Sequence, residues 1–242
     1  MDIATLLLSA LAALVALTIH EFAHGYVAYK LGDDTAKSLG RLSLNPIKHL
    51  DPFGALCMIL FHFGWAKPVP INPRNFKNPR RGFAITACAG PLTNILVGFF
   101  TAFLYLLCLY NIKETDSAFL NNLQVNTVLF LMYFFSINIG LGVFNLIPVP
   151  PFDGSRILNV ILPQRLYFKV MKYERQMYWG VIAWLFFGQY VYYALLSVPI
   201  ISSTPILASI AKIFSLSDIL SDAINTIANG MIRFWSLIPI FR

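Results

Sequence analysis

The chain has 242 residues, of which 57% are hydrophobic and only 12% carry a charge. Soluble domains are about 45–50% apolar and about 25% charged, so this composition excludes an ordinary soluble protein and predicts an integral membrane protein. The net charge of +7 would suit nucleic-acid binding, but the basic residues lie in loops between apolar stretches, where membrane topology places them. We therefore expect a lipid bilayer around the chain and no nucleic-acid partner.

Four apolar stretches are each long enough to cross the hydrocarbon core of a bilayer, which takes roughly 20 helical residues. They cover residues 3–31, 82–110, 125–147 and 177–201. A fifth stretch, residues 205–235, has apolar residues at helical spacing and a polar opposite face, which predicts an amphipathic helix lying on the membrane. The sequence thus predicts an all-α polytopic membrane protein, with a membrane-embedded core at 1–201 and a C-terminal amphipathic, interfacial segment at 202–242.

The first stretch contains the sequence His20-Glu21-Phe22-Ala23-His24. Positions i and i+4 lie on one face of a helix, so the two histidines can bind one metal ion. Glu21 lies beside that face, where it can accept a proton from a water molecule at the metal. This spacing predicts one catalytic Zn²⁺ per chain, with His20 and His24 as ligands and Glu21 as the general base.

A catalytic zinc site usually has three protein ligands, so a third is needed. The candidates outside the motif are His49, Asp51, His62, Asp153, Glu174 and the three cysteines. Asp153 is favoured because Pro148, Pro150 and Pro151 must end the helix of the third stretch just before it. Irregular backbone at membrane depth is tolerated where it is buried in protein or lines a cavity. The alternative for Asp153 is an ordinary Asp-Gly turn after a helix.

The basic residues indicate how the chain is oriented in the membrane. Eight lie between the first and second stretches and five between the third and fourth, whereas the loop between the second and third has only Lys113. The eight in the first loop are Lys37, Arg41, Lys48, Lys67, Arg74, Lys77, Arg80 and Arg81. The five in the third loop are Arg156, Arg165, Lys169, Lys172 and Arg175. By the positive-inside bias these two loops are cytoplasmic, which places the active site towards the cytoplasmic side of the cell membrane.

These motifs resemble those of the site-2 proteases, a family of intramembrane zinc metalloproteases. The similar segments are His20-Glu21-Phe22-Ala23-His24, Pro151-Phe152-Asp153-Gly154, Gly90-Pro91-Leu92-Thr93-Asn94 and Gly64-Trp65-Ala66-Lys67-Pro68-Val69-Pro70. The resemblance covers roughly residues 1–200 and is to short members that have no PDZ or CBS module. It implies a metalloendopeptidase that hydrolyses peptide bonds within or near transmembrane segments of membrane-protein substrates, in regulated intramembrane proteolysis. The resemblance leaves open whether the chain forms an oligomer.

Two asparagines are further candidates for substrate binding. Asn94 lies within an otherwise apolar stretch, where an unpaired amide is costly and needs a partner. The resemblance implies that Asn94 holds the substrate backbone or polarises the scissile carbonyl; the alternative is a hydrogen bond between helices. Many members of the family have Asn-Pro-x before Asp-Gly where this chain has Pro151-Phe152, so we expect Asn145, further upstream, to take that polar role.

Two loop regions carry weaker signals. Residues 61–71 alternate aromatic residues, glycine and proline, and Pro68 and Pro70 lack N–H donors, which suits an edge strand. Here the resemblance implies a small membrane-associated β-hairpin that pairs with an unwound substrate segment; the alternative is a surface loop. His49 and Asp51 suit a second metal site less well than a structural loop in which they hydrogen-bond the backbone.

Two other classes of function remain as alternatives. A zinc transporter would also bury His and Asp in its spans, but it needs polar ligands along a path across the membrane. The second and fourth stretches offer little beyond Asn94 and Gln189. A non-catalytic scaffold with this fold would be expected to lose Glu21 or a ligand, and the chain retains all of them. Peptide hydrolysis is therefore the favoured function.

Overall fold

The computed structural model describes residues 3–54, 57 and 65–241, and these residues form helices and irregular segments without a β-sheet. The helices are α1 (Ile3–Lys30), α2 (Thr35–Ser38), α4 (Pro79–Tyr110), α5 (Ala118–Asn145), α6 (Asp153–Ile161), α7 (Gln164–Met171), α8 (Glu174–Leu196), α9 (Pro199–Ser203), α10 (Pro205–Ala211) and α11 (Leu216–Ser236). Single 3-10 turns are η1 (Pro46–Lys48), η2 (Pro73–Asn75), η3 (Lys212–Phe214) and η4 (Pro239–Phe241). The predicted all-α class is confirmed.

Four of the described helices, α1, α4, α5 and α8, are long and apolar enough to cross a membrane, and they match the four predicted stretches. Their ends are set by local caps. α4 begins earlier than expected because the Asn78 side chain accepts a hydrogen bond from the Arg81 N–H (3.2 Å) and Pro79 starts the helix. α5 also begins earlier, because the Ser117 side chain caps its first turn.

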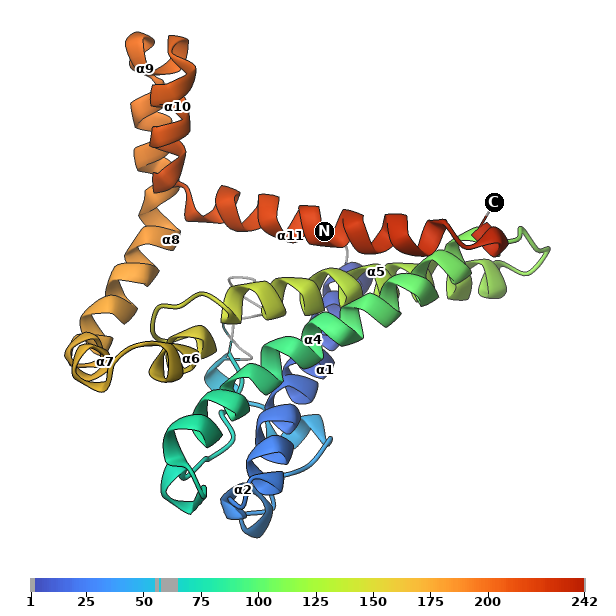
Figure 1. Ribbon diagram of the computed structural model, residues 1–242. Helices are drawn as coiled ribbons and strands as arrows, with labels where there is room; N and C mark the ends of the chain where they lie inside the picture. Colours follow the sequence, from blue (N-terminus) through green and yellow to red (C-terminus); the bar gives the residue numbers. More distant parts are fainter. Residues whose placement is uncertain (1–2, 55–56, 58–64, 242) are drawn as a thin grey trace.

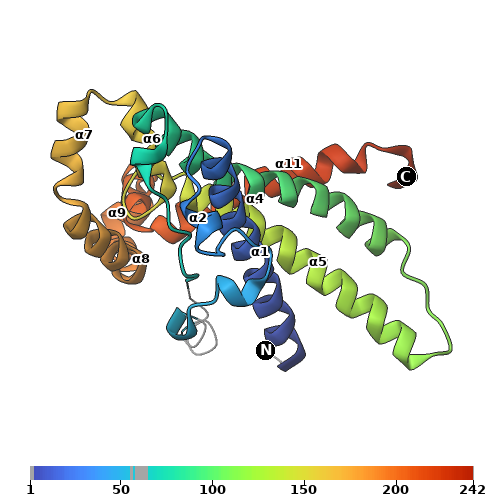
Figure 2. The same cartoon turned by 90° about the horizontal axis from the view of Figure 1, so that it is seen from below.

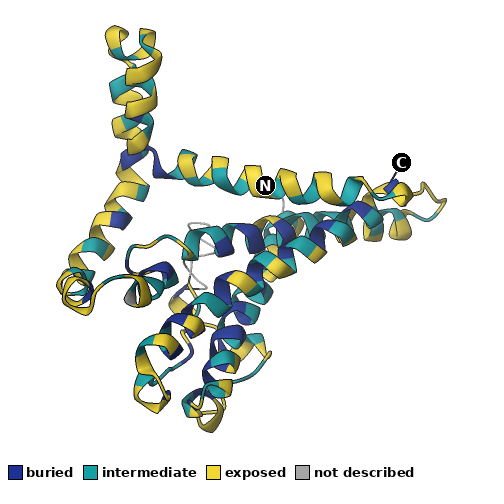
Figure 3. Cartoon of the chain, viewed as in Figure 1, coloured by how far each residue is buried: buried dark blue, intermediate teal, exposed yellow. Residues whose placement is uncertain are grey.

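The core of the molecule is formed by α1, α4 and α5, which pack side by side (Figure 1; Figure 2). Buried residues gather on these three helices, whereas α8, α9 and α10 are mostly exposed (Figure 3). The close approach of α4 to α5 requires a glycine at Gly98, where an added Cβ would lie 2.4 Å from Cδ1 of Ile139. This packing fixes the positions of the elements that carry the candidate site.

The C-terminal part forms an arm and a covering helix. α8, α9 and α10 stand away from the core, and α11 then returns to pack along α4 and α5 (Figure 1). The Trp235 indole N–H donates to the Phe99 carbonyl (2.7 Å), which fixes α11 against α4. The expectation of one helix over residues 205–235 is wrong. Ser215 separates η3 from α11, and its side chain caps α11 by accepting from the Asp218 N–H (3.4 Å).

The β-hairpin expected over residues 61–71 is not formed in the described part of that segment, and residues 61–64 lie outside the described residues. From Trp65 onward the chain is extended, with a single antiparallel bridge between Leu50 and Ala66. Pro68 and Pro70 have no N–H, and the Val69 N–H between them donates to Glu21. Residues 68–70 therefore have no free backbone N–H that could donate a hydrogen bond to a second strand. We call residues 65–71 the connecting segment.

A buried carboxylate fixes the end of α1 to the connection before α4. Asp33 is fully buried (0% exposed). Its Oδ2 accepts from the Asn72 N–H (2.7 Å), and its Oδ1 accepts from Asn75 Nδ2 (2.7 Å) and from the Thr35 N–H (3.1 Å). Burial alone would raise the pKa of Asp33, but these hydrogen bonds outweigh it and hold the pKa below its ordinary value.

We expect Asp33→Ala to lower the free energy of unfolding by about 1–3 kcal/mol, because buried donors lose their acceptor. Asp34→Ala is the matched control, since Asp34 is exposed and its side chain makes no capping hydrogen bond. Because folding lowers the Asp33 pKa, its stabilisation is present above the unfolded-state pKa and is lost as the pH falls through the folded-state value. Thermal unfolding in detergent at neutral and acid pH measures both effects. Equal melting temperatures for the two variants would contradict this assignment.

Candidate metal centre

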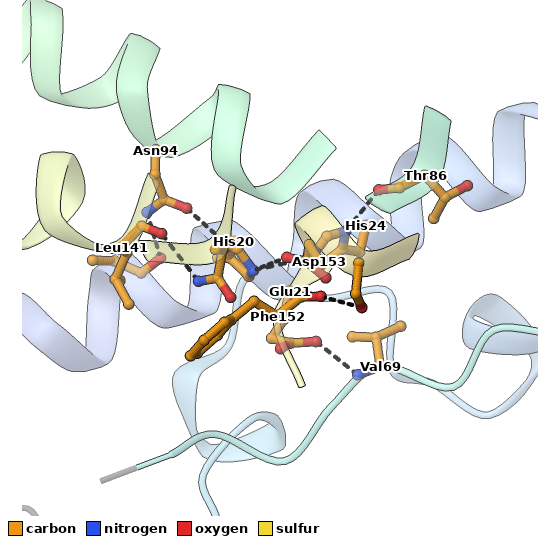
Figure 4. A network of polar contacts seen from close by, with 12 residues as sticks. His20, Glu21, His24, Val69, Thr86, Asn94, Leu141, Phe152 and Asp153 are labelled. Atoms are coloured by element: carbon orange, nitrogen blue, oxygen red, sulfur yellow. Dashed lines mark hydrogen bonds and ion pairs between the residues drawn. The ribbon is translucent and has the colours of Figure 1, made fainter. Parts of the chain in front are cut away.

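α1 carries both histidines of the motif on one buried face. His20 and His24 are 5% and 6% exposed, and their Nε2 atoms lie 3.0 Å apart. α6 brings Asp153 to the same point, with its Oδ2 3.2 Å from His20 Nε2 and 3.1 Å from His24 Nε2 (Figure 4). Among the residues described, this is the one group of three His, Cys, Asp or Glu side chains close enough to share a metal ion.

Asp153 reaches the histidines because the chain turns sharply after α5. The helix ends at Asn145, the prolines that follow cannot continue it, and α6 begins at Asp153. Gly154 lets the first turn of α6 approach this turn closely, since an added Cβ would lie 2.4 Å from the carbonyl oxygens of Leu146 and Ile147. A larger residue at position 154 would push Asp153 away from α1.

Hydrogen bonds at the other ring nitrogens decide which atoms the histidines present. Nδ1 of His24 lies 2.7 Å from the Thr86 carbonyl oxygen, and Nδ1 of His20 lies 2.7 Å from Oδ1 of Asn94. Both partners are acceptors, so each Nδ1 carries the proton and each Nε2 carries a lone pair. Two nitrogen lone pairs and a carboxylate oxygen therefore converge with no proton between them. This arrangement needs a cation.

The spacing of the three atoms fits zinc. Bonds of about 2.0–2.1 Å in a tetrahedron place neighbouring ligand atoms about 3.3 Å apart. The observed separations are 3.0–3.2 Å. Two imidazoles and one carboxylate are also a donor set that suits a catalytic zinc ion with an open position.

The charge of Asp153 is suited to metal binding. In its ionised form Asp153 would supply the negatively charged oxygen that binds a metal ion. Its side chain remains 23% exposed, so the site is accessible from one side.

Glu21 lies beside the three ligands in a large cavity. Its Oε2 accepts a hydrogen bond from the Val69 N–H (2.7 Å), so the connecting segment holds the carboxylate in place (Figure 4). The cavity has a volume of about 970 Å³, and Glu21 and the three ligand residues line it. Much of the remaining wall is apolar, with Leu17, Ala87, Phe144 and Ile224 contributed by α1, α4, α5 and α11. A metal site, a base and an apolar surface thus share one space.

The two candidate asparagines differ in their settings. Asn145 lines the cavity, and its Nδ2 donates to the Leu141 carbonyl (3.0 Å). Asn94 is fully buried, is not among the described residues that line the cavity, and contacts His20. This geometry favours the hydrogen bond between helices as the role of Asn94, in place of direct contact with a substrate.

His49 and Asp51 lie outside the three-residue group. His49 is buried and its Nε2 donates to the Ser43 carbonyl (2.7 Å). Asp51 Oδ1 accepts from the Gly54 N–H (2.8 Å). Both side chains thus bond the backbone, which supports the structural interpretation of this loop. His62 lies outside the described residues.

Two features of the site, at Val69 and Asn138, were missed in the sequence, whereas a third, Gly90, belongs to a motif that the sequence analysis identified. Val69 acts through its backbone N–H, which leaves no signal in the side chain. Asn138 accepts a hydrogen bond from Asn94 (2.8 Å) and is an amide within an apolar stretch, the same signal that identified Asn94. Gly90 lies against both histidines, and an added Cβ would be 2.4 Å from His24 Nε2 and 2.6 Å from His20 Cε1.

We expect Gly90→Ala to weaken zinc binding at least about 10-fold, the lower range for losing a residue that orients a ligand. The added methyl group would meet two packed imidazole rings, so α1 and α4 must separate or a ring must rotate. Gly180→Ala in α8 is the matched control, because its Cβ would meet nothing within 4 Å. Chelator competition on both purified variants measures the zinc dissociation constant. Unchanged affinity in Gly90→Ala would contradict the packing described here.

Comparisons with known proteins identify the family of the chain. Residues 8–188 match the model of "Peptidase family M50". The chain is 41% identical to "Putative zinc metalloprotease YwhC" of Bacillus subtilis, over 76% of this chain and 83% of that protein. It is 30% identical to "Zinc metalloprotease MJ0392" of Methanocaldococcus jannaschii, over 62% of this chain and 33% of that protein. No solved structure matches this chain. The family match shows that this chain, which has four described helices long and apolar enough to cross a membrane, belongs to peptidase family M50, the site-2 protease family of zinc metalloproteases.

Proposed function

We propose that the chain is an intramembrane metalloendopeptidase that hydrolyses peptide bonds within or near transmembrane segments of membrane proteins, with one zinc ion per chain. The observation that carries the proposal is the convergence of His20, His24 and Asp153 beside Glu21 in one largely apolar cavity. The cavity is built mainly by helices long and apolar enough to cross a membrane. A substrate that enters it from the bilayer would bury apolar side chains against these walls.

The residues divide the chemistry among them. His20, His24 and Asp153 would hold zinc, which supplies Lewis-acid polarisation of the scissile carbonyl and makes water acidic enough to react near neutral pH. Glu21 accepts the proton of the attacking water at its carboxylate and then delivers it to the leaving amine. The Val69 N–H donates to Oε2 of Glu21 and holds the carboxylate in place, while Oε1 makes no such bond to Val69 and is the oxygen we assign to the proton. Asn94 orients His20, as its 2.7 Å contact with Nδ1 supports.

The substrate must present its backbone to these groups. A helical segment hides its amides in internal hydrogen bonds, so the substrate has to unwind locally before attack. Asn145 lies on the cavity wall and is the residue we assign to a hydrogen bond with the unwound backbone. The connecting segment lies on the same wall through Trp65, Ala66 and Val69.

The experiment that tests this function is co-expression of the chain with candidate single-span membrane proteins. The unsubstituted chain should shorten at least one of them, and the Glu21→Gln variant should shorten none. Equal products from both chains would assign the cleavage to another protease.

We also propose that the site faces the cytoplasm, from thirteen basic residues in two loops against Lys113 in the third. Single cysteines at Lys77 and Lys113 in a cysteine-free chain test this orientation. A membrane-impermeant thiol reagent added to intact cells should label position 113 and spare position 77. Labelling of position 77 alone would show that the orientation is the opposite of the one proposed. It would then also contradict the release of product towards the cytoplasm.

A further inference from the structure

The two histidines of the site are oriented in different ways. His24 Nδ1 donates directly to a main-chain carbonyl, that of Thr86, which can only accept. His20 Nδ1 faces the Asn94 side chain, and an amide can present either its oxygen or its nitrogen. If the nitrogen faced Nδ1, the ring proton would move to Nε2 and the lone pair that a metal needs would be lost. The orientation of the Asn94 amide therefore matters for the site.

Asn138 of α5 is the nearer of the two acceptors that fix that orientation, the other being the Ala16 carbonyl. Its Nδ2 donates to the Phe134 carbonyl (2.7 Å), so its Oδ1 faces Asn94. Asn94 Nδ2 donates to this oxygen (2.8 Å) and to the Ala16 carbonyl (3.3 Å). Oδ1 of Asn94 is then left to accept from His20 Nδ1 (2.7 Å). The Phe134 carbonyl thus sets the orientation of the Asn138 amide, which favours that of the Asn94 amide, which in turn places the ring proton of His20 on Nδ1.

Burial makes this chain of hydrogen bonds selective. Asn94 and Asn138 are both fully buried (0% exposed), so bulk water does not compete for their amides. Gly98 allows α4 and α5 to approach at this level, since its added Cβ would lie 2.4 Å from Ile139 Cδ1 and 3.7 Å from Asn138 Cβ. The hydrogen bonds also join α5, which leads into Asp153, to the helix that carries His20.

We propose that Asn138 is a positioning residue for the metal site. Acting through Asn94, it holds His20 in the tautomer whose Nε2 binds zinc. This inference rests on the proposed role of His20 as a ligand. It assigns to α5 a part in orienting a ligand on α1, in addition to its connection to Asp153.

The test compares Asn138→Leu with Asn138→Asp by chelator competition for zinc in the purified chain. Leu removes the acceptor for Asn94, and we expect about 10-fold weaker zinc binding, the lower range for an outer partner of a ligand. Asp keeps an oxygen towards Asn94, and its buried, protonated carboxyl can still donate to the Phe134 carbonyl, so it should restore most of the affinity. Thr101→Val is the control, because it removes a buried hydrogen bond within α4, to the Val97 carbonyl (2.7 Å), outside the chain of asparagines.

Two results would overturn the proposal. One is unchanged zinc affinity in folded Asn138→Leu, or in Asn138→Ala if the Leu variant does not fold. The other is an equal loss in the Leu, Asp and Thr101→Val variants, which would show a general effect of packing. Failure of the unsubstituted chain to bind zinc would instead overturn the proposed function, so the two failures are distinguishable.

An independent observation concerns α7, which lies between α6 and α8. Its basic residues Arg165 and Lys169, with Lys172 at its C-cap, fall on one stripe of the helix. All three are exposed, and within the described part of the chain none forms an ion pair. The rest of the helix is largely apolar, and Leu166 and Phe168 are 45% and 64% exposed.

We infer that α7 docks on an anionic bilayer surface. The membrane-crossing helix α8 begins at Glu174, directly after the turn that follows α7, so α7 lies close to the membrane–water interface. A short helix at that depth, with a basic stripe flanked by the exposed Leu166 and Phe168, can place its basic residues against lipid phosphates and these two apolar side chains at the boundary with the acyl chains. Docking would also support α6, the helix that begins with the metal-site residue Asp153.

Lipid retention tests this docking without reference to activity. The chain is reconstituted in vesicles of equimolar phosphatidylcholine and phosphatidylglycerol, extracted in mild detergent, and its bound lipids are counted by phosphorus NMR. Retained phosphatidylglycerol should fall at least about 5-fold in Arg165→Gln/Lys169→Gln/Lys172→Gln, the effect of about one lost basic contact. The control Arg74→Gln/Lys77→Gln/Arg81→Gln removes three exposed charges elsewhere and should retain the lipid. Equal retention in both variants, or equal loss, would overturn the docking site.

Discussion

Replacing Glu21 by Gln is expected to reduce peptide hydrolysis at least about 100-fold, the usual contribution of a general base. The amide has nearly the same shape as the carboxylate, but it cannot accept a proton from water. Its oxygen can still accept from the Val69 N–H, so the connecting segment should stay in place. Zinc content and melting temperature should therefore match those of the unsubstituted chain.

The comparison is made on purified, zinc-loaded protein, with metal content measured in the same samples. Val69→Pro is an informative companion, because it removes the N–H that holds Glu21 and leaves the carboxylate itself unchanged. We expect an intermediate loss of activity from it. Full hydrolysis by zinc-loaded Glu21→Gln would show that another group takes the proton.

Replacing Asp153 by Ala is expected to remove zinc and activity together. Two imidazoles would remain, and losing a ligand should weaken zinc binding by at least about 100-fold, the upper range for losing an outer partner. Asp51→Ala is the matched control. Asp51 accepts from the Phe53 and Gly54 N–H groups (3.0 and 2.8 Å), so its loss should loosen that loop and leave zinc bound.

Metal analysis of the two variants distinguishes the outcomes. Normal zinc content in Asp153→Ala would show that the third ligand is a residue other than Asp153. Loss of zinc in both variants to the same extent would indicate that the loop at Asp51 supports the site as strongly as a ligand does.

The sequence was sufficient to predict the parts of this molecule that depend on strong local signals. Long apolar stretches require helices in a bilayer, so α1, α4, α5 and α8 were found. The His-Glu-x-x-His spacing places two imidazoles on one helical face, and three prolines force the turn that frees Asp153. These signals need no knowledge of how the helices pack.

The features that were missed depend on tertiary contacts. The Val69 N–H bonds Glu21, and a main-chain donor cannot be read from the identity of its side chain. Pro68 and Pro70 suited an edge strand, but this choice depended on a partner strand that the described residues do not supply. The division of residues 205–235 follows from the capping serine at position 215, which interrupts an otherwise continuous periodic pattern. Asn94 was recognised as needing a partner, and only the packing of α1, α4 and α5 identifies His20 and Asn138 as those partners.

The most direct test of the central claim is to map the bond that the purified, zinc-loaded chain cuts in a reconstituted single-span substrate. Mass spectrometry of both products identifies that bond. The account predicts a cut within or at the edge of the apolar segment, lost when zinc is chelated, restored when zinc is returned, and absent with Glu21→Gln. Cleavage confined to the soluble regions of the substrate, or cleavage that survives zinc removal, would contradict it.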